Sequence, residues 1–325
     1  MIIAYNNSEK HFSPKNKFET PNRTYGTIKH LLNIFPKESF LEKIDNNIDE
    51  AIKLIENVHC KNYIQNLKNM IGNNYYCKNC LKETKNKCTE CNDDSYYISW
   101  DNDTYQTPES FEIICEAINI IKNICHKFFE KQIKYAYLLI RPPSHHAGES
   151  SPHGFCLVNS TMVAAKYLQQ LGFNKIVIFD YDLHANNGTV EIIKNTENIY
   201  SCSIHCFGIF PFTGDIEENN EKILNIPLFM GASTKQYTAA VKNIVLPFIE
   251  KVKPDLIIVS NGFDAHVEDK LEIMNVDDSF YINTTIILKN LNIPLLYILE
   301  GGYNPEVIKR LSEGIIKELI SVELS

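Results

Sequence analysis

Short apolar runs alternate with helix-like segments over the second two thirds of the chain, and this pattern limits the fold more than any other feature. Continuous apolar runs of this length are typical of strands buried on both faces, and helices between them make such strands parallel. The sequence therefore predicts an α/β fold with a mainly parallel sheet covered by helices. The predicted strands are 135–140, 175–180, 199–204, 256–260 and 293–299, and the predicted helices are 109–131, 158–171, 188–194, 235–251, 277–291 and 305–320.

The first third of the chain is less regular. Helices are expected at 25–34 and 38–58, and a polar, cysteine-rich stretch follows at 72–95. The sequence contains no internal repeat and no long linker, and 325 residues suit one large α/β domain or two small ones. We predict a single domain, 1–325, that carries a small insert at 72–95.

The composition argues against several classes of protein. No apolar run approaches the roughly 18 residues of a membrane helix, and the N-terminus lacks the basic and apolar regions of a secretion signal. The formal net charge of −8 argues against broad contact with nucleic-acid phosphates. We expect no membrane association, no direct nucleic-acid binding and an intracellular location, cytoplasmic or nuclear, whereas the oligomeric state stays open.

Four of the ten cysteines form two CxxC pairs separated by seven residues. This spacing is typical of a zinc ion held by four thiolates, and such an ion folds a segment too small for a core of its own. The other six cysteines are scattered in apolar or strand-like stretches, as expected in a reducing compartment. We predict a structural zinc knuckle; a reduced loop without metal is the alternative, and two disulfides fit this compartment less well. The predicted ligands are Cys77, Cys80, Cys88 and Cys91.

Reactive side chains follow four of the predicted strands, each just after the carboxyl end of its strand. In open parallel sheets, ligands bind beyond this edge. We therefore expect these residues to share one site: His145 and His146 after 135–140, Asp182 and His184 after 175–180, Asp264 after 256–260, and Tyr303 after 293–299.

The residue types at this edge suit metal-assisted hydrolysis. Asp182 and His184 are two apart on an extended segment, so both side chains can point to one face, and Asp264 adds a third ligand. Three such ligands leave a fourth position open, as in hydrolytic zinc sites, although two carboxylates and one imidazole also suit ferrous iron. Paired histidines can exchange protons near neutral pH, and the phenol of Tyr303 could donate a hydrogen bond to an oxyanion.

The motifs RPPSHHA, HGFCLVN, DYDLHANNGT, FPFTGD, NGFDAH and EGGYN, in this order and spacing, resemble those of the histone deacetylase and acetylpolyamine amidohydrolase superfamily. RPPxHHA, GFD and EGGYN are similar to its class II branch. The resemblance is strong over about 100–305 and weaker over 20–35. It implies an arginase-like, three-layer α/β/α fold and hydrolysis of an acylated amine by metal-activated water.

The resemblance also implies roles for individual residues. Zinc would be held by Asp182, His184 and Asp264, His146 would act as general base and acid with His145 as its electrostatic partner, and Tyr303 would polarise the acetyl carbonyl. Asn187 stands where the partner of the second histidine is expected, and this neutral side chain should leave His146 a usable base at neutral pH. Asp180 matches the carboxylate that orients His145. A possible potassium site would involve Asp180, Asp182, His184 and Ser203.

Further matches concern the substrate. The resemblance implies that Phe155 and Phe210 form the aromatic pair of an acyl-lysine tunnel, with Gly154 at its wall. Asp103 matches a rim aspartate that holds the substrate backbone, and Arg23 resembles the arginine of an inner channel for acetate release. Leu271, seven positions after Asp264, stands where polyamine-specific members carry a carboxylate.

Three hypotheses on function remain open. The first is a zinc-dependent hydrolase that removes acetyl or longer acyl groups from lysine in a peptide or protein, and Leu271 favours it. The second is an acetylpolyamine or other small-amide hydrolase with the same reactive residues. The third is a non-catalytic module that binds acyl-lysine while the cysteine insert recruits partners; the presence of Tyr303 speaks against it.

Overall fold

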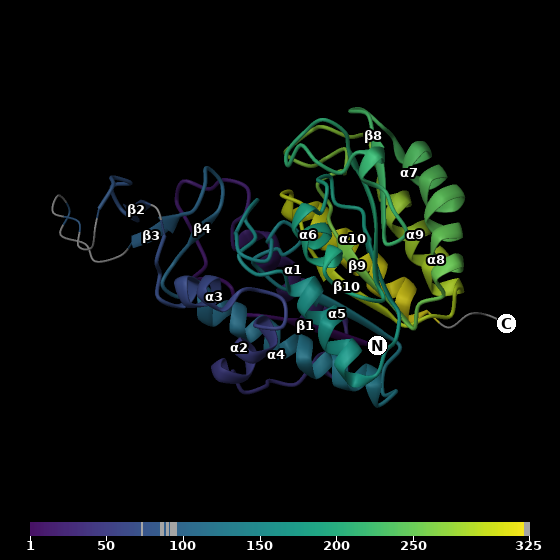
Figure 1. Ribbon diagram of the computed structural model, residues 1–325, viewed down its shortest axis with the longest axis horizontal. Coiled ribbons are helices and arrows are strands. Elements are labelled where there is room, and N and C mark those ends of the chain that lie inside the picture. The colour runs from purple at the N-terminus through teal and green to yellow at the C-terminus, as the bar shows by residue number, and fades with distance from the viewer. Residues whose placement is uncertain (73, 85–87, 89–90, 92–95, 322–325) are drawn as a thin grey trace.

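The computed structural model describes residues 1–72, 74–84, 88, 91 and 96–321. Its centre is a sheet of seven parallel strands in the order β1-β5-β10-β9-β6-β7-β8, which confirms the predicted parallel α/β fold (Figure 1). The strands are β1 (Ile2–Tyr5), β5 (Tyr135–Leu139), β6 (Ile176–Asp180), β7 (Ile199–Cys206), β8 (Ile223–Leu228), β9 (Leu256–Asn261) and β10 (Leu295–Leu299).

Helices cover both faces of this sheet and give a three-layer molecule. One face carries α2 (Ile48–Ile55), α3 (Lys61–Lys68), α4 (Ser110–Phe129), α5 (Ser160–Leu171) and α6 (Asn187–Lys194). The other carries α1 (Asn22–Ile34), α7 (Thr234–Ala240), a π-helical turn (Val241–Val245), α8 (Leu246–Val252), α9 (Asp278–Asn290) and α10 (Pro305–Ile320).

The side chains of each apolar strand pack into two separate cores, because successive side chains of a strand point to opposite faces of the sheet. On β6, Ile176 and Ile178 pack into the core with α4 and α5, whereas Val177 and Phe179 pack into the core with α9 and α10. This double burial explains why the central strands show no alternation of polar and apolar residues.

The structure differs from the sequence-based expectation at the edges. The predicted helix at 38–58 is correct only in its second half: a short 3₁₀ turn, Lys37–Ser39, is followed by an extended segment, and α2 begins only after Asn47. Asn47 caps α2 by accepting a hydrogen bond from the backbone N–H of Glu50, and Leu41 N–H donates to the carbonyl of Ile3 beside β1. The helix α3 and the edge strands β1 and β8 were not predicted, and Asn225 and Pro227 interrupt the apolar run of β8.

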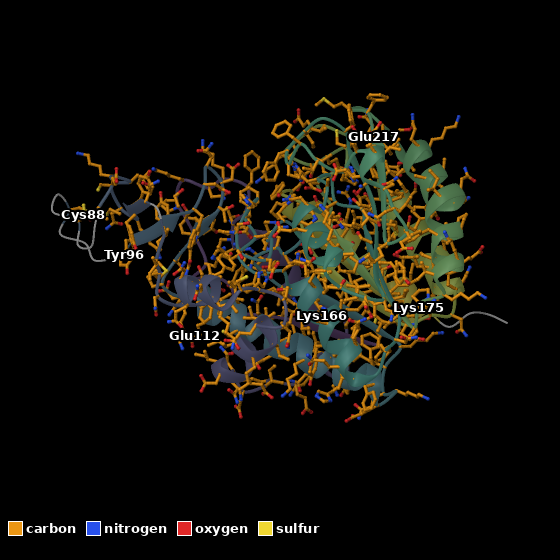
Figure 2. The ribbon with its side chains drawn as sticks, in the orientation of Figure 1. Cys88, Tyr96, Glu112, Lys166, Lys175 and Glu217 are labelled. Atoms are coloured by element: carbon orange, nitrogen blue, oxygen red, sulfur yellow. The ribbon has the colours of Figure 1, made fainter. Side chains whose placement is uncertain are left out.

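A three-stranded antiparallel sheet lies at the left of Figure 1, beside the main body. It consists of β2 (Asn74–Cys77), β3 (Tyr96–Ser99) and β4 (Tyr105–Gln106), in the order β2-β3-β4. Figure 2 shows Cys88 and Tyr96 toward its outer end. The predicted insert, 72–95, comprises β2 and the loop after it; 73, 85–87, 89–90 and 92–95 lie outside the described residues. The single domain 1–325 with this insert stays a prediction.

Among the described residues, no helix combines the length and the apolar character that crossing a bilayer requires.

Candidate active site

The carboxyl edge of the central sheet gathers the reactive side chains, because neighbouring parallel strands all end there. β6 leads into Asp182 and His184, β9 into Asp264 and β10 into Tyr303. β5 leads into the loop that carries the histidine pair 145–146. The structure thus brings together all six side chains that the strand pattern placed at one edge.

Three of these side chains converge on one point. One ligand atom each of Asp182, His184 and Asp264 lies within 4.8 Å of the others. Asp182 Oδ1 and Asp264 Oδ2 are each 3.1 Å from Nδ1 of His184, close to the separation of about 3.3 Å between tetrahedral ligands that lie about 2.0 Å from zinc.

The chemistry of this cluster fits a cation. Asp182 and Asp264 are fully buried, and Oδ2 of Asp264 makes no well-formed hydrogen bond among the described residues. Burial and the nearby charge of Asp182 raise the pKa of Asp264 to about 7, because two carboxylates at such close range repel each other. A buried carboxylate oxygen without a donor is costly, and a divalent ion would satisfy it.

Main-chain donors hold both carboxylates in place. Gly301 N–H donates to Oδ2 of Asp182 at 2.7 Å, and Leu183 N–H donates to Oδ1 of Asp264 at 2.8 Å. A Cβ atom at Gly301 would lie 2.3 Å from Oδ2 of Asp264 and 2.4 Å from Oδ2 of Asp182. Only glycine therefore allows the loop after β10 to pass so close to the cluster.

The two histidines differ in their hydrogen-bond partners. Nδ1 of His145 lies 2.9 Å from Oδ2 of Asp180, whereas Nδ1 of His146 lies 2.6 Å from Oδ1 of Asn187, so Nδ1 of His146 is assigned as the donor. This assignment leaves Nε2 of His146 as the proton acceptor. The two ring centroids are 4.0 Å apart.

The electrostatic surroundings of His145 and His146 shift their pKa values in opposite directions. Burial alone would lower the pKa of His145, but the carboxylates of Asp182 and Asp180 outweigh it and raise that pKa to about 10. Burial lowers the pKa of His146 well below its usual value, and the charges of His145 and His184 lower it further. His146 is therefore neutral at neutral pH, beside a charged His145.

Tyr303 is nearly buried and its main chain is anchored. Its backbone N–H donates to Oδ2 of Asp269 at 2.6 Å, and the N–H of Asn304 donates to the same oxygen at 3.1 Å. Burial, followed by the charge of Asp264, raises the pKa of Tyr303 well above its usual value. The phenol thus stays protonated and able to donate a hydrogen bond.

A narrow cavity of about 160 Å³ leads to this group of residues. Gly154 forms part of its wall with a φ of 51°, and a Cβ atom there would lie 2.4 Å from Cδ2 of His146. The rings of His146 and Phe210 meet edge to face at 5.0 Å, and those of Phe155 and Tyr303 at 5.8 Å. The lining residues are Phe18, Asp103, His146, Gly154, Phe155, His184, Phe210, Leu271 and Tyr303.

Arg23 and Ser203 are among the predicted site residues that lie outside this lining. Arg23 is buried behind the loop after β10, where its Nε donates to the carbonyl of Gly302 at 2.6 Å and its Nη2 donates to the carbonyl of Glu300. Ser203 lies opposite Asp180 in the register of β6 and β7. The channel role of Arg23 and the potassium site stay predictions.

Three contributors to the site were missed at the sequence level. Phe18 lines the cavity, Asp269 anchors Tyr303, and Glu300 accepts hydrogen bonds from Ser144 N–H and His145 N–H at 2.6 and 3.1 Å. Glu300 could have been found from the sequence, because a carboxylate directly after a buried strand needs hydrogen-bond donors. Phe18 and Asp269 could not, because their partners are distant in sequence.

The four cysteines of the insert also converge. Their sulfur atoms lie within 4.8 Å of one another, with Cys77 Sγ 3.4 Å from Cys91 Sγ and Cys80 Sγ 3.4 Å from Cys88 Sγ. All ten cysteines lie in the described residues, and none of them forms a disulfide. Tetrahedral thiolates at about 2.3 Å from zinc would be about 3.8 Å apart, so this cluster fits such an ion.

Comparisons with known proteins agree with this architecture. The histone deacetylase domain model matches residues 17–319. Histone deacetylase 15 of Arabidopsis thaliana is 34% identical over 236 residues, which cover 70% of this chain and 42% of the plant protein. The crystal structure of the HDA15 HD domain has a TM-score of 0.85 at 26% identity, covering 100% of this chain and 92% of that one.

A second solved structure shares the fold alone. An acetylpolyamine aminohydrolase from Burkholderia pseudomallei has a TM-score of 0.78 at 19% identity, and the match covers 98% of each chain. The parallel sheet and the family match over most of the chain define an amide hydrolase of arginase-like fold. The chain belongs to the histone deacetylase family, which confirms the resemblance drawn from its motifs.

Proposed function

We propose that this protein hydrolyses the amide of an acetylated or longer acylated lysine in a peptide or protein. One observation carries the proposal: the ligand atoms of Asp182, His184 and Asp264 converge beside a narrow, aromatic-walled cavity that His146 and Tyr303 also line. Such a cavity suits an aliphatic chain that ends in a polar group.

Asp182, His184 and Asp264 would hold the catalytic ion, with zinc as the first choice and ferrous iron as the alternative. When bound, such an ion supplies positive charge to the carbonyl oxygen and lowers the pKa of water. Nε2 of His146 would remove a proton from the attacking water and return it to the departing amine. His145, paired with Asp180, would supply a fixed positive charge beside it.

Tyr303 would donate its phenolic hydrogen to the carbonyl oxygen as negative charge develops there. Asn187 would keep His146 in the tautomer that leaves Nε2 free. Phe155, Phe210 and Gly154 would enclose the methylene groups of the lysine side chain, and Asp103 at the rim would accept hydrogen bonds from the substrate backbone.

The other predicted ligands belong to the same proposal. The fit of the cysteine cluster supports a structural zinc held by Cys77, Cys80, Cys88 and Cys91. A potassium ion near Asp180, Asp182, His184 and Ser203 stays part of the proposal, as does the role of Arg23 in acetate release. Ten cysteines without a disulfide support a reducing location, cytoplasmic or nuclear.

The alternative substrate is an acetylated polyamine, which would need a carboxylate for its cationic tail. Leu271 lines the cavity where that carboxylate is expected, and Asp103 is the acidic residue of the lining. Two other nearby acidic side chains are engaged elsewhere. Glu268 pairs with Arg310 at 2.6 Å, and Asp269 accepts the hydrogen bond from Tyr303 N–H. This arrangement favours lysine over a polyamine.

A substrate comparison tests the proposal. Purified, metal-loaded protein should hydrolyse acetyl-lysine and longer acyl-lysine peptides faster than N-acetylspermidine, and a hydroxamate should inhibit both reactions. Faster hydrolysis of N-acetylspermidine would favour the polyamine hypothesis. Tight binding of acyl-lysine peptides without any hydrolysis would favour the non-catalytic module.

A further inference from the structure

A second hollow opens beside the mouth of the catalytic cavity. It has a volume of about 430 Å³ and lies between the loop 15–18 and the small β2-β3-β4 sheet. On the side of the sheet it is lined by residues that include Tyr76, Tyr97 and 101–105. We call this hollow the side groove. In Figure 1 the purple N-terminal loops run beside β4.

The side groove is continuous with the catalytic cavity. Phe18 and Asp103 line both hollows. The walls are also joined, because Phe155 N–H donates to Oγ1 of Thr104 at 3.1 Å. A chain whose acylated lysine fills the cavity must therefore pass Phe18 and Asp103 with its backbone, next to the open end of the groove.

We propose that the side groove binds the residues on one flank of the acylated lysine, a step that rests on the proposed function. The occupant is an extended peptide segment of the substrate. The small sheet that forms one wall thereby becomes a substrate-recognition element.

The charges of the groove favour a peptide. Lys15 and Lys17 balance Asp101 and Asp103, so the lining carries no net charge to attract a polycationic tail. Lys15 Nζ lies 3.7 Å from the centre of the Tyr76 ring, and this cation–π contact holds the amine against the groove wall. A neutral lining rich in amides and hydroxyl groups matches the alternating donors and acceptors of a peptide backbone.

Two stacked aromatic rings form part of the groove wall. Tyr76 and Tyr97 both line the groove, and their ring centroids are 5.6 Å apart. The hydroxyl group of Tyr97 forms a hydrogen bond within the protein, to the side chain of Ser13. The stacked pair therefore offers a substrate segment a rigid wall on the side of the small sheet.

The groove walls are held in a fixed shape. Oδ1 of Asp101 accepts hydrogen bonds from the backbone N–H groups of Asp103 and Thr104, at 2.9 and 2.5 Å. Nδ2 of Asn16 donates to the carbonyl of Asp103 at 3.2 Å and ties the N-terminal loop to the opposite wall. Because the groove is already formed, little conformational entropy is lost when a peptide binds. Contacts in the groove should therefore raise the affinity for the peptide.

A length series of substrates tests the inference. The probes are acetyl-lysine with both ends blocked, the same residue extended by four residues toward the N-terminus, the same residue extended toward the C-terminus, and N-acetylspermidine. In the wild-type protein, extension in one direction should raise kcat/KM about tenfold, whereas extension in the other direction should have little effect.

Two groove variants and one control sharpen the test. Tyr76→Leu removes an aromatic ring from the groove wall, and Lys15→Ala removes the exposed amine above that ring. Each should reduce the gain from extension by about three- to tenfold, the value of one contact between the peptide and the groove. Tyr200→Leu, a matched change on β7 away from the groove, should keep the wild-type gain.

The outcomes separate this inference from the proposed function. If no probe is hydrolysed, the proposed function fails. If acetyl-lysine is hydrolysed but neither extension changes kcat/KM, the function stands and the groove inference is wrong. If Tyr76→Leu lowers kcat/KM for N-acetylspermidine as much as for the extended peptide, the groove does not select a peptide, and the inference is also wrong.

Discussion

At the scale of single residues, the site depends on main-chain anchors as much as on the reactive groups. Oδ2 of Asp269 accepts hydrogen bonds from Tyr303 N–H and Asn304 N–H, while its Oδ1 accepts one from Leu271 N–H at 3.1 Å. One buried carboxylate therefore fixes both the phenol and a residue of the cavity wall. The phenol of Tyr303 and the carboxylate of Asp269 that anchors it have separate roles, and each role can be tested with its own variant.

The phenol itself is tested by Tyr303→Phe. Loss of one oxyanion donor in an enzyme site typically costs about 10²–10³ in rate, and we expect kcat to fall by this factor. The measurement is steady-state kinetics on an acetyl-lysine peptide. An unchanged kcat would remove Tyr303 from the mechanism.

The anchor is tested by Asp269→Asn, which keeps the shape of the side chain but weakens its acceptors. We expect kcat to fall about tenfold with little change in KM. One charge-assisted hydrogen bond contributes about 1.5–3 kcal/mol, and only part of this energy serves to position the phenol. Glu268→Gln, a neighbouring carboxylate paired with Arg310 at the surface, is the matched control. Equal kinetics of the two variants would contradict a positioning role for Asp269.

At the scale of elements, the sequence predicted the central strands well because their signal is local. The apolar runs and the reactive residues after them follow from a few adjacent positions, so β5, β6, β9 and β10 and the residues at their ends could be placed. The edge strand β1 is short, and Asn225 and Pro227 interrupt the apolar run of β8. The first half of the helix expected at 38–58 is extended instead, because it pairs beside β1. The anchor between Asp269 and Tyr303 spans 34 positions and left no local signal.

The small sheet carries a prediction about metal. Because the four sulfur atoms lie close enough for one tetrahedral ion, purified protein should contain about two zinc ions per chain. Cys91→Ser should reduce this to about one while metal at the catalytic cluster is kept. Cys60→Ser, an exposed cysteine outside the cluster, serves as the control and should keep both ions. One zinc ion in the wild-type protein, unaffected by Cys91→Ser, would leave the cluster without metal.

At the scale of the whole molecule, a buried ionic cluster ties the N-terminal loops to the sheet. Glu19 accepts hydrogen bonds from Arg141 Nη2 at 2.7 Å and Arg23 Nη1 at 3.2 Å, and His11 Nε2 lies 3.6 Å from Oε2 of Glu19. All four side chains are at least 99% buried. The cluster was not predicted, because its members come together only when β5 and the N-terminal segment are folded.

This cluster should make stability depend on pH. Burial lowers the pKa of His11 from 6.5 to about 3. Burial would raise the pKa of Glu19, but Arg141 outweighs it and lowers that pKa from 4.5 to about 2. Both folded pKa values lie below the unfolded ones, so this stabilisation is complete above pH 6.5 and is lost as pH falls toward 2; each unit of difference is worth about 1.4 kcal/mol.

The measurement is the free energy of unfolding by denaturant between pH 7 and pH 3. His11→Phe keeps a ring stacked on Tyr105 but cannot titrate, so its stability should fall less steeply between pH 6.5 and pH 3. His153→Gln changes an exposed histidine and should keep the wild-type slope. Identical slopes for all three proteins would exclude the buried histidine as a source of acid sensitivity.

A cation held by Asp182, His184 and Asp264 is central to the proposed chemistry. The most direct measurement is hydrolysis of an acetyl-lysine peptide by protein stripped of metal and then titrated with Zn²⁺, beside Asp264→Asn treated in the same way. We expect no hydrolysis after stripping, recovery on titration of the wild-type protein, and no recovery in the variant. Full hydrolysis by the stripped wild-type protein would contradict a catalytic metal at this site.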